Sequence, residues 1–302
     1  MKLSSQVIVL SAVTAVSSLA VTSQTLQADM ATPIAATGWN ADVVYAANSP
    51  TDVAQGFDGT HAWDAAGAGT TDGSNDNNGL PSDQYSPTNP YTFTSSMANQ
   101  INSSNTSFQF QSFIGNNVLY LNGANSLAQS TLTLAAPAAY NNLAILAASA
   151  SSSVKNGLLT ASFVLHFTDG STSAAINYDP YDWGAGYSNS TADNLNALPN
   201  RVDRSAASGG TEASTFYPAD SAGQYYNMYE SDINLLNSSN YANKLISSIS
   251  FNAPSSGDIG IFAISGVVNP TPVVLAPEPA PLAALLCALT GMLLLGRRKT
   301  HG

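Results

Sequence analysis

The sequence predicts an all-β protein built as an antiparallel β-sandwich or jelly roll. Many short segments alternate apolar and polar side chains, which is typical of strands with one buried face. Gly, Pro and Asn separate these segments, and no apolar stripe of helical period runs for about 12 residues or more in the middle of the chain. The chain has 302 residues, of which 44% are hydrophobic, so it can bury a core. We expect one large domain over residues 29–270.

The N-terminal residues 1–28 are expected to be a helical secretory signal peptide. Lys2 supplies the positive charge, and a mostly small and apolar stretch follows. Cleavage after Ala20 and cleavage after Ala28 both remain open, because neither site fits the small-residue preference fully. The alternative, a membrane anchor left in place, is disfavoured by the Ser and Thr in the stretch and by its weak positive flank.

Ten segments are expected to form strands. They are residues 41–46, 107–112, 117–121, 130–135, 143–148, 160–167, 171–178, 225–235, 245–251 and 260–267. Asp169-Gly170 predicts a two-residue hairpin turn, because Gly readily adopts positive φ. The strand at 245–251 and the strand after Gly257 are expected to form a second hairpin, and the excess length to lie in loops at 50–106 and 178–216. His166 is expected to be a packing residue of its strand.

The C-terminal residues predict a membrane anchor. Residues 271–279 read as a Pro-rich linker, 280–296 as a transmembrane helix and 297–302 as a basic cytoplasmic tail. At 1.5 Å per residue the uncharged stretch would be roughly 25 Å long, enough for a thin bilayer core. The cations would stay in the cytoplasm and the domain outside. A buried amphipathic helix is the alternative, but the stretch has no polar face.

The tail resembles the PEP-CTERM sorting signal of bacterial exported proteins. The resemblance rests on Pro277-Glu278-Pro279, on the apolar stretch and on Arg297-Arg298-Lys299, together with the N-terminal signal. It implies recognition of Pro277, Glu278 and Pro279 by an exosortase, a membrane transpeptidase with a Cys nucleophile. It also implies anchoring in the inner membrane before processing, removal of the helix, and transfer of the domain to the cell surface or the exopolysaccharide matrix.

The middle of the chain resembles a β-sandwich domain that recurs in such surface proteins. The resemblance rests on Trp39-Asn40-Ala41-Asp42-Val43-Val44, Gly79-Leu80-Pro81, Asn116-Asn117-Val118-Leu119-Tyr120-Leu121, Pro137-Ala138-Ala139-Tyr140, Phe167-Thr168-Asp169-Gly170, Asp182-Trp183, Arg201-Val202-Asp203-Arg204 and Ile261-Phe262-Ala263-Ile264-Ser265-Gly266. The architecture that it implies is similar to galactose-binding-like jelly rolls, and it supplies no active-site residues to assign to this chain.

Composition excludes several function classes. Only 9% of the residues are charged and the net charge is −11, so a nucleic-acid partner, which needs a basic footprint, is not expected. The single Cys lies inside the apolar tail, which excludes a disulfide framework and a thiolate metal site. No cofactor is expected, with calcium as the one metal to consider.

The loop around Asp72, Ser74 and Asp76 has oxygen ligands at alternate positions, as a calcium loop does. The sixth position is Asn77 rather than Gly, and Asp83 at the twelfth is shorter than Glu. A solvated loop is therefore the competing interpretation.

A second candidate site is a sugar-binding loop. Tyr181, Asp182 and Trp183 combine aromatic and acidic side chains, and Arg201 and Arg204 lie on the same long connection. Sugars stack on exposed aromatic rings and pair with such polar groups. The alternative is that Trp183 closes one end of the sandwich, because Trp is usually buried.

The sequence therefore favours a non-enzymatic surface or matrix protein that associates with exopolysaccharide or binds carbohydrate. The competing class is a secreted glycoside hydrolase, which needs two carboxylates at a defined separation. Glu is scarce, no carboxylate pair stands out, and no catalytic residue is assigned.

Overall fold

The structure is a computed structural model. It describes residues 30–46, 56–59, 61–65, 80, 91–98, 105–124, 128–150, 159, 161–184, 195–201, 203–205, 216–217, 226–236, 241, 243–253 and 257–269. In these residues the chain forms seventeen β-strands and no helix, which confirms the all-β prediction. The expected signal helix at 1–28, the linker at 271–279, the transmembrane helix at 280–296 and the basic tail at 297–302 lie outside this set. None of the described segments is a helix that could span a bilayer.

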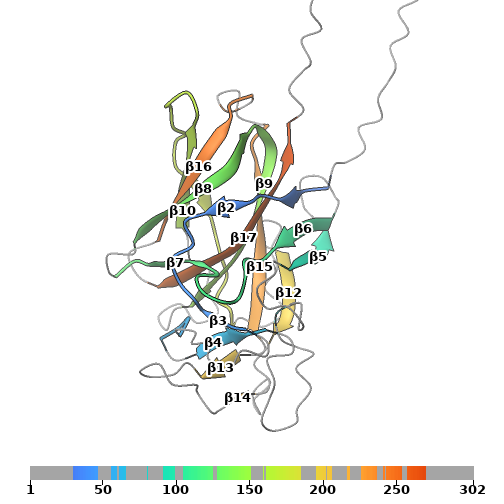
Figure 1. The fold of residues 1–302 in the computed structure, drawn as a ribbon, viewed down its shortest axis with the longest axis vertical. Helices are drawn as coiled ribbons and strands as arrows, with labels where there is room; N and C mark the ends of the chain where they lie inside the picture. The colour runs from blue at the N-terminus through green and yellow to red at the C-terminus, as the bar shows by residue number, and fades with distance from the viewer. Residues whose placement is uncertain are drawn as a thin grey trace, which may run out of the picture.

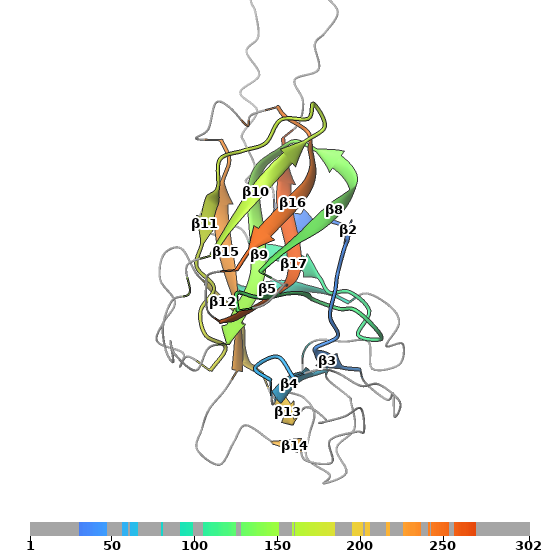
Figure 2. The ribbon, with the colours of Figure 1, turned by 90° about the vertical axis from the view of Figure 1, so that its left-hand side faces the viewer.

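Two antiparallel sheets form the body of the molecule (Figures 1 and 2). In sheet A the order is β1 (Thr32–Pro33), β17 (Asp258–Val268), β9 (Tyr140–Ala150), β15 (Tyr226–Asn234) and β12 (Leu195–Arg201), and β7 (Leu119–Asn122) pairs with the first half of β17. In sheet B it is β11 (Ile176–Tyr178), β10 (Ala161–Phe167), β16 (Ile246–Asn252), β8 (Gln129–Ala138) and β2 (Ala36–Thr37). The arrangement is compatible with a β-sandwich.

Two smaller sheets complete the described chain. One has the order β14 (Phe216–Tyr217), β13 (Asp203–Ser205), β4 (His61–Asp64) and β3 (Val44–Tyr45). The other pairs β5 (Thr92–Ala98) with β6 (Asn105–Gln109). In Figure 1, β3, β4, β13 and β14 lie at the lower pole of the molecule, whereas the end of β17 lies in its upper part.

Sheet A has apolar side chains on both faces. Ile145 and Ala147 of β9 contribute to the core shared with sheet B. Ala144, Leu146 and Ala148 of the same strand contribute to a second core on the opposite face. The continuous apolar run of β9 follows from this position, because a strand covered on both faces needs no polar side chain along its middle.

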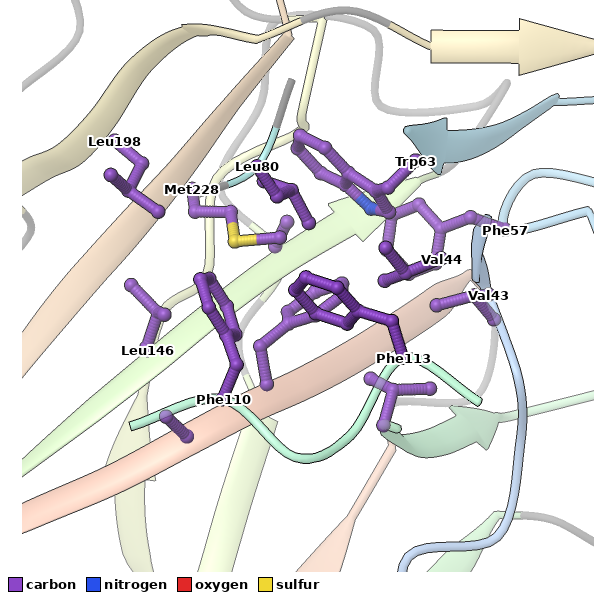
Figure 3. Packing of buried hydrophobic residues seen from close by; sticks show 14 of the residues in the cluster. Val43, Val44, Phe57, Trp63, Leu80, Phe110, Phe113, Leu146, Leu198 and Met228 are labelled. Carbon is purple, nitrogen blue, oxygen red and sulfur yellow. The ribbon is translucent and has the colours of Figure 1, made fainter. Parts of the chain in front are cut away.

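The second core is rich in aromatic rings and joins the small sheets to sheet A (Figure 3). Phe110 stacks on Phe93 with ring centroids 4.9 Å apart, and it also contacts Phe113. Phe57 and Trp63 approach from the loop before β4 and from β4 itself, with centroids 6.2 Å apart. Burial of such large side chains is the main stabilising term for these short elements.

The first predicted hairpin forms, but with a longer turn than expected. Phe167 N–H donates to Ser171 O at 2.9 Å, and Gly170 N–H donates to Phe167 O at 3.0 Å. Gly170 has a φ of 81°, whereas Asp169 has no positive φ. The loop is therefore three residues with Gly in the left-handed position, and the predicted two-residue turn is wrong.

The second predicted hairpin is also wrong. β16 lies in sheet B and β17 in sheet A, so the chain crosses between the sheets instead of folding back within one. The difference follows from the side chains: β16 has one apolar and one polar face, whereas β17 is buried on both faces apart from its ends. β17 therefore fits the middle of sheet A and not the solvent-facing sheet.

The two segments expected to be loops contain strands. β4 and β5 lie within residues 50–106, and β12 and β13 lie within 178–216. β4 and β13 have only four and three residues, and β12 contains two Asn and Pro199. Short length and residues of low β-propensity concealed strands that pairing and core contacts stabilise.

Candidate functional site

The predicted sugar loop is inserted into sheet A. Trp183 N–H donates to Ser149 O of β9 at 2.8 Å, and Asn227 N–H of β15 donates to Trp183 O at 2.9 Å. Ser149 N–H donates to Tyr181 O at 2.8 Å, and Asp182 forms a parallel bridge with Ser149. The segment thus lies as a short strand between β9 and β15, and its three side chains are buried.

Trp183 packs in the aromatic core and is only 4% exposed. Its ring centroid lies 4.2 Å from that of Tyr226 and 5.1 Å from those of Phe57 and Trp63. A ring covered by three aromatic neighbours has no face available for a sugar. The structure therefore favours the packing interpretation of Trp183 over the sugar platform.

The neighbours of Trp183 in the loop are buried as well. Tyr181 packs against Tyr229 at a centroid distance of 5.2 Å. Asp182 accepts a hydrogen bond from Gly184 N–H at 2.9 Å, a contact that closes the turn after the inserted segment. These contacts assign Tyr181 and Asp182 to the packing and turn geometry of the loop.

Arg201 and Arg204 are placed by their backbones alone. Arg201 pairs with Tyr226 at the end of β12, and Arg204 pairs with Ala62 in the small sheet. Their side chains lie outside the described part of the structure.

The predicted calcium ligands Asp72, Ser74 and Asp76 also lie outside the described residues. Within the described residues, no three His, Cys, Asp or Glu side chains are grouped so that they could hold a metal ion.

An acidic corner lies where β7 meets the start of β17. Asp258 Oδ1 accepts hydrogen bonds from Tyr120 Oη at 2.7 Å and from Asn122 Nδ2 at 2.5 Å. Burial raises the pKa of the Asp258 carboxyl, and the charge of Asp58 adds to the rise. Asp58 in turn accepts from His61 N–H at 2.7 Å. The fold thus brings the carboxylates of Asp58 and Asp258 near each other, although the two residues are far apart in the sequence.

Glu230 is fully buried on β15, where the Thr106 hydroxyl donates to its Oε1. Its position on the aromatic-core side of sheet A separates it from solvent. The Glu230 side chain therefore belongs to the interior of the fold and is not part of a surface site.

A third arrangement covers the outer face of sheet B, which Figure 2 views directly. Along β10 the side chains of Phe163 and Leu165 enter the core, so Ser162, Val164 and His166 point outward. The pairing registers align the outward positions into three rows across the strands. The rows are Asn177, Ser162, Asn252 and Gln129; Val164, Ser250 and Thr131; and Thr172, His166, Ser248, Thr133 and Thr37.

We call these twelve positions the polar face. They include no Asp, Glu, Lys or Arg, and Val164 is the one apolar member. The nearest charges in the adjoining hairpin compensate each other, because Lys244 Nζ lies 3.0 Å from Asp169 Oδ2. The polar face is therefore a surface of hydrogen-bonding groups without formal charge while His166 is neutral.

Several side chains of the polar face are hydrogen-bonded to one another. The Ser250 hydroxyl lies 2.7 Å from Thr131 Oγ1 and 2.8 Å from His166 Nε2. The chain of contacts crosses three strands and restricts the side-chain rotamers. His166 was expected to be a packing residue of its strand, and the polar face was not predicted. The period-2 alternation of residues 161–167 is the sequence signal that could have predicted it.

Comparison with protein-family models, with curated proteins and with solved structures found no match for this chain.

Proposed function

We propose that this chain is an exported, non-enzymatic protein of the bacterial cell surface or extracellular polysaccharide matrix, anchored before processing through its C-terminal segment. The observation that carries the proposal is the pairing of β1 with the end of β17, in which Thr32 pairs with Gly266 and Pro33 with Ser265. The first and last strands of the described body are therefore neighbours, and the end of β17 lies on the side of the body opposite to β3, β4, β13 and β14 (Figure 1). A tether at the C-terminus would hold the body by this side and display β3, β4, β13 and β14 away from the membrane.

The winding of the strands supports a jelly roll, the finer architecture within the sandwich class. From β7 onward the chain crosses between the two main sheets at each step except from β10 to β11 and from β12 to β15, and without β1, β2 and β12 the orders are β7-β17-β9-β15 and β8-β16-β10-β11. Two four-stranded sheets wound in this nested way make the jelly-roll arrangement. We infer a body similar to galactose-binding-like domains, preceded by a signal helix and followed by a transmembrane helix.

In this proposal the tail carries the sorting information. An exosortase recognises Pro277, Glu278 and Pro279, and the prolines keep the segment extended in front of the membrane. Arg297, Arg298 and Lys299 hold the end of the chain in the cytoplasm until the helix is removed. Calcium at Asp72, Ser74 and Asp76 remains a separate prediction, and the function requires no cofactor.

The sorting step is tested in a bacterium that has an exosortase. We expect the wild-type chain to reach the surface or medium without its apolar tail, as intact-protein mass spectrometry of each cell fraction would measure. The double variant Pro277→Ala/Pro279→Ala should keep the tail and stay in the membrane fraction. The matched control Pro270→Ala/Pro272→Ala changes prolines of the same region outside the tripeptide and should behave as wild type. A full-length chain recovered from the cytosol would contradict the proposal.

A secreted carbohydrate-active enzyme is the second candidate, and the acidic corner is the observation that favours it. A glycosidase needs one carboxyl group with a raised pKa and a second carboxylate about 5–10 Å away. Asp258 offers the first and Asp58 is the candidate for the second. Release of reducing ends from a polysaccharide by the wild-type chain, abolished in Asp258→Asn, would favour the enzyme over the binder.

A further inference from the structure

We infer that the polar face of sheet B is the docking surface for an uncharged polysaccharide chain. This inference deepens the proposed matrix function and rests on it. Eleven of the twelve positions present hydroxyl, amide or imidazole groups in three cross-strand rows. A polymer of sugar rings carries hydroxyl groups that both donate and accept, and it can exchange hydrogen bonds to water for hydrogen bonds to this surface.

The absence of formal charge on the face selects the class of polymer. An acidic polysaccharide would have to give up hydration of its carboxylates without meeting a cation, which is unfavourable. Lys244 is beside the face, but its ammonium already contacts Asp169 at 3.0 Å and Ser171 Oγ at 2.6 Å. A neutral chain has no such cost.

The side chains also argue against a protein partner. Protein interfaces are anchored by buried aromatic, Met and Arg side chains. The polar face has none of these residue types, and Val164 is its one apolar side chain. A polyhydroxyl polymer can instead bind through hydrogen bonds to the hydroxyl and amide groups of the face.

The central hydrogen bonds lower the cost of binding. The Thr131, Ser250 and His166 side chains already contact one another at 2.7 and 2.8 Å. Groups held in place before binding lose less conformational entropy when a ligand arrives. Each single contact remains weak, so retention depends on many copies of the protein engaging one long polymer.

The test measures retention of the full chain in affinity gels that contain a polysaccharide. The chain is kept in a polyoxyethylene detergent, which has no sugar headgroup that could compete. The probes are dextran and hydroxyethylcellulose, which are uncharged, and alginate, which is acidic. We expect retention by at least one neutral polymer, none by alginate, and no change between about 0.05 and about 0.5 M salt, because no ion pairs are involved.

The double variant Thr131→Val/Thr133→Val removes two hydroxyl groups and keeps β-branched side chains, so we expect an unchanged melting temperature and about 10-fold weaker retention. Thr131→Ser keeps the hydroxyl and should retain the wild-type behaviour. Thr94→Val, an exposed strand threonine of β5, is the matched control and should also bind as wild type.

Several outcomes overturn the inference: no retention by either neutral polymer, retention by alginate that salt abolishes, an equal loss in Thr94→Val, or unaltered retention in the double variant. Sedimentation showing a dimer that the double variant dissociates would assign the face to a second copy of the chain instead. A chain that is sorted correctly but binds no neutral polymer would refute this inference alone. A chain that stays in the cytosol would refute the proposed function while leaving the retention result intact.

Discussion

Trp183 shows how one side chain acquires a role that its sequence neighbours do not predict. An exposed Trp beside Tyr and Asp would make a sugar platform, but here the main chain of Trp183 bonds to β9 and β15. Those bonds bring the indole against Tyr226, Phe57 and Trp63. Two of these contacts come from a segment more than a hundred residues away in sequence, and local composition carries no information about them.

Replacing this ring should therefore affect stability. We expect Trp183→Ala to lower the free energy of unfolding by about 3–5 kcal/mol, because the change leaves a large cavity in the aromatic core. Trp183→Phe should cost less, since it keeps an aromatic ring in the site. Urea denaturation of the full chain measures both. An alanine variant of normal stability that no longer binds a polysaccharide would restore the sugar-platform interpretation.

At the scale of elements, the turn after β10 depends on one carboxylate. Asp169 accepts hydrogen bonds from the Ser171 hydroxyl at 2.5 Å and from Ser171 N–H at 2.9 Å, and Lys244 lies beside it. These contacts, the Ser171 hydroxyl foremost, lower the pKa of Asp169 to about 2. The ionised form is therefore favoured in the folded hairpin, so Asp169 stabilises the fold while it is ionised.

This stabilisation has a defined pH window. It is present above the unfolded pKa of about 4 and disappears as the pH falls through about 2. We expect Asp169→Asn to melt at a lower temperature than wild type at neutral pH, with the gap closing between about pH 4 and about pH 2. Scanning calorimetry across this range checks the result.

Asp258→Asn is the control, because its effect on the melting temperature at neutral pH should have the opposite sign. Burial raises the pKa of Asp258, so ionisation there costs stability at neutral pH, and an amide can still accept the bonds from Tyr120 and Asn122. The Asn variant should melt higher than wild type at neutral pH, with the gap closing as the pH falls through the raised pKa. Matching pH profiles for the two variants would refute both assignments.

At the scale of the whole molecule, sheet A couples two cores. β9 and β17 contribute side chains to the core facing sheet B and to the aromatic core on the other side. Neither core can lose its packing without exposing these strands. The described body should therefore unfold as one cooperative unit.

Substitutions in the two cores provide the test. Phe163→Ala, in the core between the sheets, and Phe110→Ala, in the aromatic core, should each lower the free energy of unfolding by about 3–5 kcal/mol. Each variant should still show a single calorimetric transition, shifted as a whole. Two separate transitions in either variant would show that the aromatic core and its small sheets fold independently.

Local periodicity was sufficient for the class of the fold and for most of its longer strands, including those at β8, β9, β10, β15, β16 and β17. A strand with one face in a core alternates apolar and polar side chains, and a strand covered on both faces, as β9 and β17 are, is a continuous apolar run, so both patterns can be recognised in the sequence of the strand itself. Short strands such as β4 and β13 were not predicted, because they are stabilised by pairing with segments distant in the chain rather than by their own β-propensity.

Only the tertiary structure decided which strands became neighbours, and with that the candidate sites. The polar face exists because register aligns β11, β10, β16, β8 and β2, and the acidic corner exists because β7 pairs with β17. The amino-acid composition predicts a charge-poor surface. The order of segments along the chain predicts export and a β-sandwich. An alternating strand has the same apolar pattern whichever strand lies beside it, so its sequence does not select its partner. The partner is selected when the strands pack and the faces of each strand are covered.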